Sequence, residues 1–114
     1  MNEKEEKKLL KLAGTMLEAV EHLKKRLAEG KVENNLYLFT DMMEAFALIE
    51  EIIYKKENMS IENMTEDLKK SFAVIISFYE EENYNEIRSY FNFVFLPAFQ
   101  TWYQKLNDNY NQIN

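Results

Sequence analysis

Apolar residues recur along this chain with the alternating three- and four-residue spacing of amphipathic α-helices, in four successive segments. The segments cover about residues 3–29, 35–56, 61–81 and 84–107. In the first of them the stripe consists of Leu9, Ala13, Met16, Val20, Leu23 and Leu27. Four half-apolar helices joined by short connections predict an all-α fold, an antiparallel four-helix bundle.

The ends of the first two segments carry residues that typically stop or start helices. Gly30 lies where a glycine in the left-handed conformation ends a helix, and Asn34 or Asn35 is a suitable N-cap for the next one. Gly14 lies inside the first segment at a cost of about 1 kcal/mol relative to alanine. Either a close helix crossing or tolerance on the polar face accounts for it. Residues 57–60 read as a connection.

The third and fourth segments meet at an acidic stretch, residues 80–82. Acids are unfavourable at a helix C-terminus and favourable beside the N-terminus of the next helix. Asn83 with Glu86 three positions later resembles a capping box, so we expect a break here, and one unbroken helix is the alternative. Pro97 removes a backbone hydrogen bond from the fourth segment. We therefore expect the last helix to be kinked, or split at Pro97.

The last segment is apolar over about 200° of its circumference, which is wider than one bundle core needs. Phe93 falls among polar residues on the projected helix, and Tyr90 lies at their border. We therefore predict an association surface for a second copy or another protein. Its candidate residues are Tyr90, Phe93, Phe95, Phe99 and Tyr103. The alternative is that a kink at Pro97 shifts the helical phase and buries all of them.

The length of 114 residues fits a single helical domain spanning residues 1–114. The net charge of -6 argues against nucleic acid and against an anionic membrane as partners. The sequence has no cysteine, and it begins with a charged stretch that lacks the apolar core of a signal peptide. We therefore expect a soluble, cytoplasmic protein.

Residues that could support catalysis or metal binding are few. The single histidine, His22, follows Glu18 at i,i+4 on the polar face, whereas di-iron bundles use two inward Glu-x-x-His motifs. The acidic pairs and triplets also project onto polar faces or lie at helix ends. We expect no catalytic residue, no cofactor and no metal site. A small helical enzyme or metal binder that uses clustered carboxylates is the alternative.

The last segment resembles the C-terminal helix of small uncharacterised helical proteins of low-GC Gram-positive bacteria. In these proteins an Asn/Asp-Tyr pair precedes an apolar helix with a central proline and a later tryptophan, and here the matching residues are Asn83, Tyr84, Pro97 and Trp102. Residues 39–46 resemble an earlier helix of the same proteins, with Ala45 where glycine is more usual. The resemblance implies a helical bundle and no assigned activity. The hypothesis that agrees with all these features is a non-enzymatic protein–protein interaction module, an adaptor or chaperone-like protein and a possible homodimer.

Overall fold

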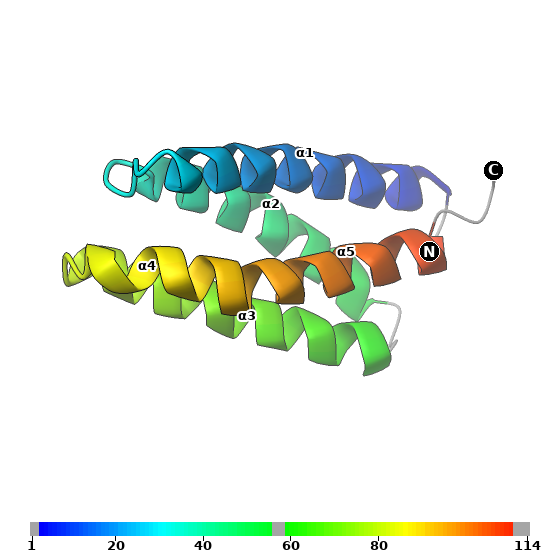
Figure 1. Cartoon of the computed structure of the whole chain (residues 1–114). Helices are drawn as coiled ribbons and strands as arrows, with labels where there is room; N and C mark the ends of the chain where they lie inside the picture. Colours follow the sequence, from blue (N-terminus) through cyan, green and yellow to red (C-terminus); the bar gives the residue numbers. More distant parts are fainter. Residues whose placement is uncertain (1–2, 56–58, 111–114) are drawn as a thin grey trace.

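The protein is described by a computed structural model that covers residues 3–55 and 59–110. The helices run up and down in turn along an elongated bundle of 42 × 23 × 21 Å (Figure 1). Each helix packs against its neighbours in the chain, and the last helix also packs against the first, which closes the bundle. The elements are α1 (Glu3–Ala28), α2 (Leu36–Tyr54), α3 (Met59–Glu80), α4 (Tyr84–Tyr90), a π-helical turn η1 (Phe91–Phe95) and α5 (Leu96–Tyr110). The all-α antiparallel fold predicted from the sequence is confirmed.

The cores of α1 and α2 follow the predicted stripes. All six residues of the α1 stripe are buried. The buried residues of α2 lie on one face with the same three- and four-residue spacing, namely Leu38, Phe39, Met42, Ala45, Phe46, Ile49, Ile52 and Ile53. The apolar spacing alone identifies the buried residues of these two helices, because both are regular from end to end and bury a single face.

Helix α1 ends in a Schellman motif at the predicted glycine. Gly30 has φ 80°, and the N–H of Lys31 donates to the carbonyl of Arg26 at 2.8 Å. The N–H of Gly30 itself donates to the carbonyl of Leu27 at 3.1 Å. These two bonds satisfy the carbonyls that the end of a helix otherwise leaves without partners.

Asn35 precedes α2, but its side chain does not cap that helix, contrary to the sequence prediction. The residue is fully buried, and its amide donates backwards to the carbonyls of Lys31 and Val32 at 2.8 and 3.1 Å. Its carbonyl oxygen accepts a hydrogen bond from Nε of Arg26. The hydroxyl of Tyr79 on α3 also donates to the Val32 carbonyl, at 2.8 Å. Asn35 therefore holds the N-cap position of α2 through its backbone, while its side chain fastens the α1–α2 connection to the bundle.

Helices α3 and α4 are separate, as the acidic stretch suggested, although the stop has another cause. Glu82 adopts φ 55°, and the N–H of Asn83 donates to the carbonyl of Phe78 at 2.8 Å, which is a second Schellman motif. The side chain of Asn83 makes no capping bond to α4, so the predicted capping box is wrong. Helix α3 begins at Met59, earlier than predicted, and residues 56–58 of the predicted helix end and connection lie outside the described residues.

The last helix is interrupted by a π turn that ends two residues before Pro97. The N–H of Leu96 donates to the carbonyl of Phe91, five residues back, instead of the carbonyl four back. Pro97 follows directly, is exposed, and has no N–H to give to Phe93. The expected irregularity is present, and it takes the form of one extra residue in a continuous helix (Figure 1).

The π turn keeps the core residues of this helix on one face. Ile87, Phe91, Phe95 and Phe99 are all buried and stand four residues apart. On a regular α-helix three such steps would carry the stripe about 120° around the axis, at 100° per residue. One extra residue in the π turn offsets about 100° of that drift.

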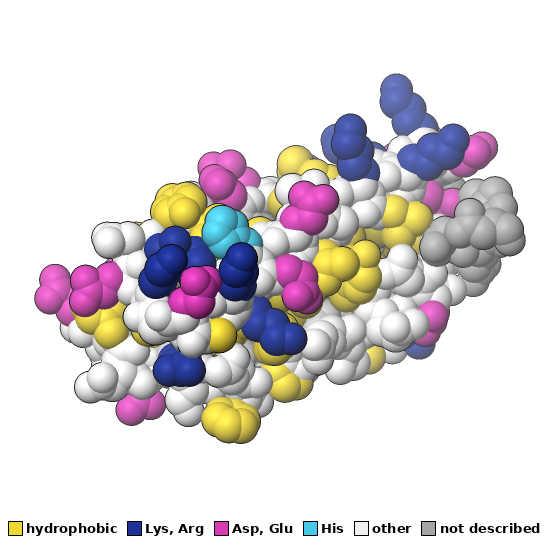
Figure 2. All heavy atoms as spheres, turned by 45° about the horizontal axis from the view of Figure 1, so that its top comes forward, with side chains coloured by type: hydrophobic (Ala, Val, Ile, Leu, Met, Phe, Trp, Pro, Cys, Tyr) yellow, Lys and Arg dark blue, Asp and Glu magenta, His cyan; other side chains and the backbone are white. Residues whose placement is uncertain are grey.

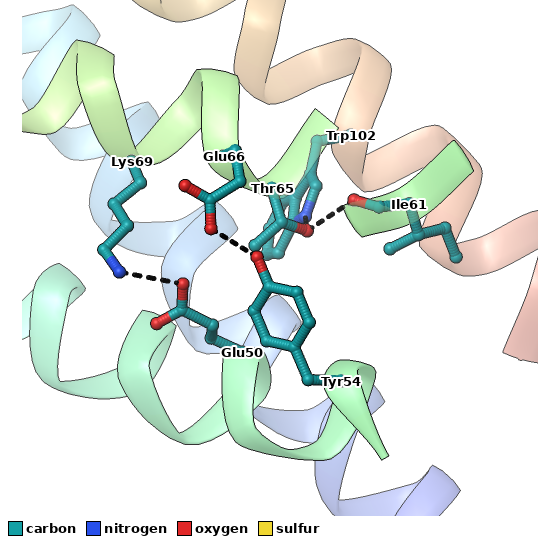
Figure 3. A network of polar contacts seen from close by, with 7 residues as sticks. All are labelled: Glu50, Tyr54, Ile61, Thr65, Glu66, Lys69 and Trp102. Atoms are coloured by element: carbon teal, nitrogen blue, oxygen red, sulfur yellow. Dashed lines mark hydrogen bonds and ion pairs between the residues drawn. The ribbon is translucent and has the colours of Figure 1, made fainter. Parts of the chain in front are cut away.

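One buried polar pair links α3 to α5 in the middle of the core (Figure 3). Nε1–H of Trp102 donates to the hydroxyl of Thr65 at 2.9 Å, and that hydroxyl donates to the carbonyl of Ile61 at 2.6 Å. Both side chains are fully buried. A buried indole N–H needs an acceptor, and Thr65 supplies it.

Candidate association surface

The most exposed large apolar side chain of the described residues belongs to the π turn. Phe93 is 79% exposed, and its neighbour Val94 is 43% exposed. The core-facing residues of the turn, Phe91 and Phe95, hold it in place, and Phe95 packs edge-on against Phe72 with ring centroids 5.0 Å apart. Phe93 therefore stands on a rigid element and projects away from the core.

Phe93 belongs to a stripe that we call the outer stripe: Tyr90, Phe93, Val94 and Pro97. Residues at positions i, i+3, i+4 and i+7 share one face of a helix, which is the spacing of helices that pack against a partner. Tyr90, at one end, is half-buried because its ring meets Phe78 of α3 edge-on, with centroids 5.7 Å apart. Pro97, at the other end, is exposed.

Two of the five residues predicted for association lie in the core. Phe95 is fully buried and Phe99 is 1% exposed, so neither can contact a partner, and this part of the prediction is wrong. The projection assumed a regular helix, whereas the π turn returns both residues to the inner face. Tyr103 is half-buried and stacks on Phe99 with centroids 5.8 Å apart. Phe93 and Tyr90 are on the outer face, as expected.

Beside the outer stripe lies a cavity of about 260 Å³ between α3 and α5, which sequence reasoning missed. It is lined by Met64, Asp67, Pro97, Ala98 and Thr101. A second hollow of about 400 Å³ shares Met64 and Thr101 with it, so a shallow groove continues along the two helices. Met64 is only half-buried, because the core face of α3 is centred on Ile61, Thr65 and Leu68.

Charge is absent from the stretch of sequence that carries the outer stripe. The sixteen residues 89–104 include no Asp, Glu, Lys or Arg, although 30% of the chain is charged. The exposed residues among them are apolar or uncharged polar, such as Ser89, Asn92, Gln100 and Thr101. Depletion of charge around exposed aromatic residues is typical of the centre of a protein–protein interface.

Exposed apolar residues on α2 are placed differently. Leu36, Tyr37, Met43 and Leu48 alternate with charged residues along that helix. On its α3 side, Lys69 pairs with Glu50 at 3.1 Å and the hydroxyl of Tyr54 donates to Glu66 (Figure 3). The bond to Glu50 raises the pKa of Lys69, and the bond to Glu66 raises the pKa of Tyr54. These contacts join α2 to α3 through charged and polar side chains.

Basic side chains gather around the single histidine at the end of α1, with acids among them (Figure 2). The hollow there, of about 520 Å³, is lined by Glu21, His22, Lys25, Arg26, Glu29 and Lys31. Lys31 is already paired with Glu29 at 3.6 Å. Arg26, its neighbour in this hollow, is held by the buried Asn35. Burial in the same region raises the pKa of Tyr79. The mixture of signs does not form a single anion site.

Clustered carboxylates were the basis of the alternative function. Over residues 3–55 and 59–110, no group of three or more His, Asp and Glu side chains is arranged to hold a metal ion. Glu18 and His22 are both exposed. No helix in the described part of the chain is long and apolar enough to cross a membrane.

The fold and this surface together define a class: an antiparallel helical bundle with a charge-free, partly exposed aromatic stripe on an irregular last helix. The chain belongs to the family described as Domain of unknown function (DUF8042), whose sequence model matches residues 6–105. No curated protein and no solved structure matches the chain. The match includes all of the outer stripe and the groove beside it, so these features lie within the family's own domain.

Proposed function

We propose that this protein is a non-enzymatic interaction module that binds another protein chain through the outer stripe, in the cytoplasm. The observation that carries the proposal is the 79% exposure of Phe93 in the middle of a charge-free helical segment. An aromatic residue kept in water by a rigid scaffold loses little conformational freedom on binding. Its burial then supplies a large share of the affinity, as aromatic anchors do in known interfaces.

The position of the stripe supports this role. The exposure of Phe93 does not disturb the packing of the residues on either side of it. Phe91 and Phe95 stack on one another with ring centroids 5.3 Å apart. The π turn also presents Phe93 next to a groove, so a partner can cover both together. No observation in the described residues favours the alternative of an enzyme or a metal binder.

Photo-crosslinking in the source cells tests the proposal directly. A photoreactive phenylalanine analogue replaces Phe93, and a matched variant carries it at Tyr37, which is 55% exposed on α2. We expect a defined crosslinked product from position 93 that Val94→Asp abolishes, and none from position 37. The absence of any product from position 93, or equal products from both positions, would overturn the proposal.

A further inference from the structure

We infer that the occupant of the outer stripe is a second copy of this chain, joined antiparallel so that Phe93 of each copy enters the cavity beside Pro97 of the other. This inference rests on the proposed function and names its partner. It follows from the positions of an exposed side chain and a hollow on one helix. The uncharged run of residues 89–104, which carries Phe93 and three of the five residues that line the hollow, and the size of the hollow support it.

Phe93 and the cavity are placed along the helix so that a two-fold axis can bring each onto the other in a neighbouring copy. Phe93 projects from the π turn, and Ala98 lies at the cavity five residues further on, about 7.5 Å along the axis at 1.5 Å per residue. A two-fold axis midway between them, near residues 95–96, places each Phe93 over the cavity of the other copy. A symmetric dimer needs a self-complementary surface, where residue i meets j and j meets i.

The cavity has the size and lining that a phenyl ring needs. Its volume is about 260 Å³. A cavity of about 150 Å³ in another protein is known to hold benzene. Pro97 and Ala98 supply apolar walls, and the flexible thioether of Met64 adapts to the ring and contacts aromatic edges favourably. Asp67 also lines this cavity.

The distribution of charge limits where two copies can meet. Two copies with a net charge of -6 each repel one another, so a stable contact must be made where neither carries charge. Residues 89–104 are the longest uncharged run in the sequence. The side chains of this run offer a partner no charge to pair with, so a surface that is itself uncharged, as that of a second copy is, fits it best.

The size of the contact predicts a weak dimer. The uncharged run is about 24 Å long as a helix, and with the edge of α3 it provides less area than the roughly 1,200 Å² of a standard stable interface. We therefore expect association that depends on concentration, with a dissociation constant between about 1 µM and about 1 mM. Sedimentation equilibrium across that range measures it.

Four variants separate the inferred arrangement from non-specific hydrophobic association. Phe93→Ser removes the inserted side chain, and Thr101→Trp fills the cavity at a position that is exposed, so neither change enters the core. Each is expected to weaken association at least tenfold, with unchanged helicity by circular dichroism. Tyr37→Ser, which removes an exposed aromatic side chain from α2, is expected to leave association unchanged. Val94→Asp places two like charges beside the symmetry axis and is a second test that leaves Phe93 in place.

A mixture of two variants gives the decisive result. In a dimer of one Phe93→Ser copy and one Thr101→Trp copy, the intact Phe93 meets the intact cavity once, whereas either variant alone has no such contact. We expect the mixed dimer to form more tightly than either homodimer. No gain on mixing, no effect of Thr101→Trp, or equal loss with Tyr37→Ser would overturn the inference.

Failure of the inference and failure of the proposed function give different results. If the wild-type chain stays monomeric up to about 1 mM while position 93 crosslinks to a different protein, the second copy is wrong and the interaction module stands. If position 93 crosslinks to nothing in the source cells, the proposed function fails as well. A wild-type dimer that Phe93→Ser and Thr101→Trp both weaken supports the two together.

Discussion

Replacing Thr65 with valine should destabilise the bundle without leaving a void. The two side chains have nearly the same shape, so the change removes the hydroxyl that accepts the N–H of Trp102 and donates to the carbonyl of Ile61, whose oxygen keeps its place in the helix. Thr65 and Trp102 are both fully buried, which leaves water no access to the indole N–H. An unsatisfied buried donor costs about 1–3 kcal/mol. This is therefore the expected loss in the free energy of unfolding.

The corresponding loss in melting temperature follows from the length of the chain. An unfolding entropy of about 2.1 cal/mol/K per residue makes 1 kcal/mol equal to about 4 °C here, so Thr65→Val should lower Tm by roughly 4–12 °C. Chemical denaturation followed by circular dichroism measures the free energy itself. The slope of the transition should not change, because the surface exposed on unfolding is the same.

A second background shows whether the hydrogen bond is the cause. With Trp102→Phe already in place, no N–H is left to satisfy, so adding Thr65→Val should cost little. We expect a coupling energy of about 1–2 kcal/mol between the two changes. If Thr65→Val is as costly in the Trp102→Phe background as in the wild type, the buried bond does not explain the loss and the reasoning is refuted.

Gly14 and Glu82 are positions where a substitution should stabilise the fold. An added Cβ at Gly14 meets nothing within 4 Å, so Gly14→Ala should raise the free energy of unfolding by about 0.5–1 kcal/mol, whereas Gly30→Ala should lower it because φ there is +80°. Glu82 holds φ 55° at the end of α3, so Glu82→Gly should stabilise by up to about 1 kcal/mol. Glu81→Gly, one residue earlier, should not stabilise. Urea denaturation of the four variants checks both pairs, and equal effects within either pair would contradict the backbone argument.

The regular part of the fold was predictable because each helix there buries one face and ends by local rules. The stripes of α1 and α2 and the glycine at position 30 depend only on nearby sequence. Asn35 and Thr65 were not predictable as core residues, since a buried polar side chain is stable only with partners from elsewhere in the chain. The partner of Asn35 is Arg26, which lies 9 residues away on α1. The partner of Thr65 is Trp102, which lies 37 residues away on α5.

The candidate surface was predictable only in part, for a related reason. Phe93 could be identified because no single core can cover the whole circumference of its helix. Phe95 and Phe99 could not be separated from it without knowing the π turn. The signal was nevertheless present: large apolar residues at 87, 91, 95 and 99 stand four apart three times in succession, which no straight α-helix keeps on one face. The cavity beside Pro97 needed the third helix as well.

The four-residue spacing of the core residues at 87, 91, 95 and 99 provides a test of why the last helix contains a π turn. Deleting Asn92, an exposed residue of the π turn, changes the core spacing from four, four, four to four, three, four. That is the pattern of a regular α-helix. The N–H of Leu96 and the carbonyl of Phe91, five apart now, would then be four apart and could make the same bond with α-helical geometry. The variant should therefore fold, with a free energy of unfolding within about 1 kcal/mol of the wild type.

Deletion of Gln100 is the matched control, because Gln100 is also exposed but lies in the regular helix α5. It leaves Phe99 and Trp102 two residues apart, about 200° around the axis, so one of these two buried rings must leave the core. Loss of a large aromatic residue from a core costs about 3–5 kcal/mol, which is a large part of the stability of a domain of this size. Circular dichroism and denaturation distinguish the two deletions. If removing Asn92 damages the protein as severely as removing Gln100, the π turn is not an inserted residue that corrects the spacing, and the burial of Phe95 and Phe99 has another cause.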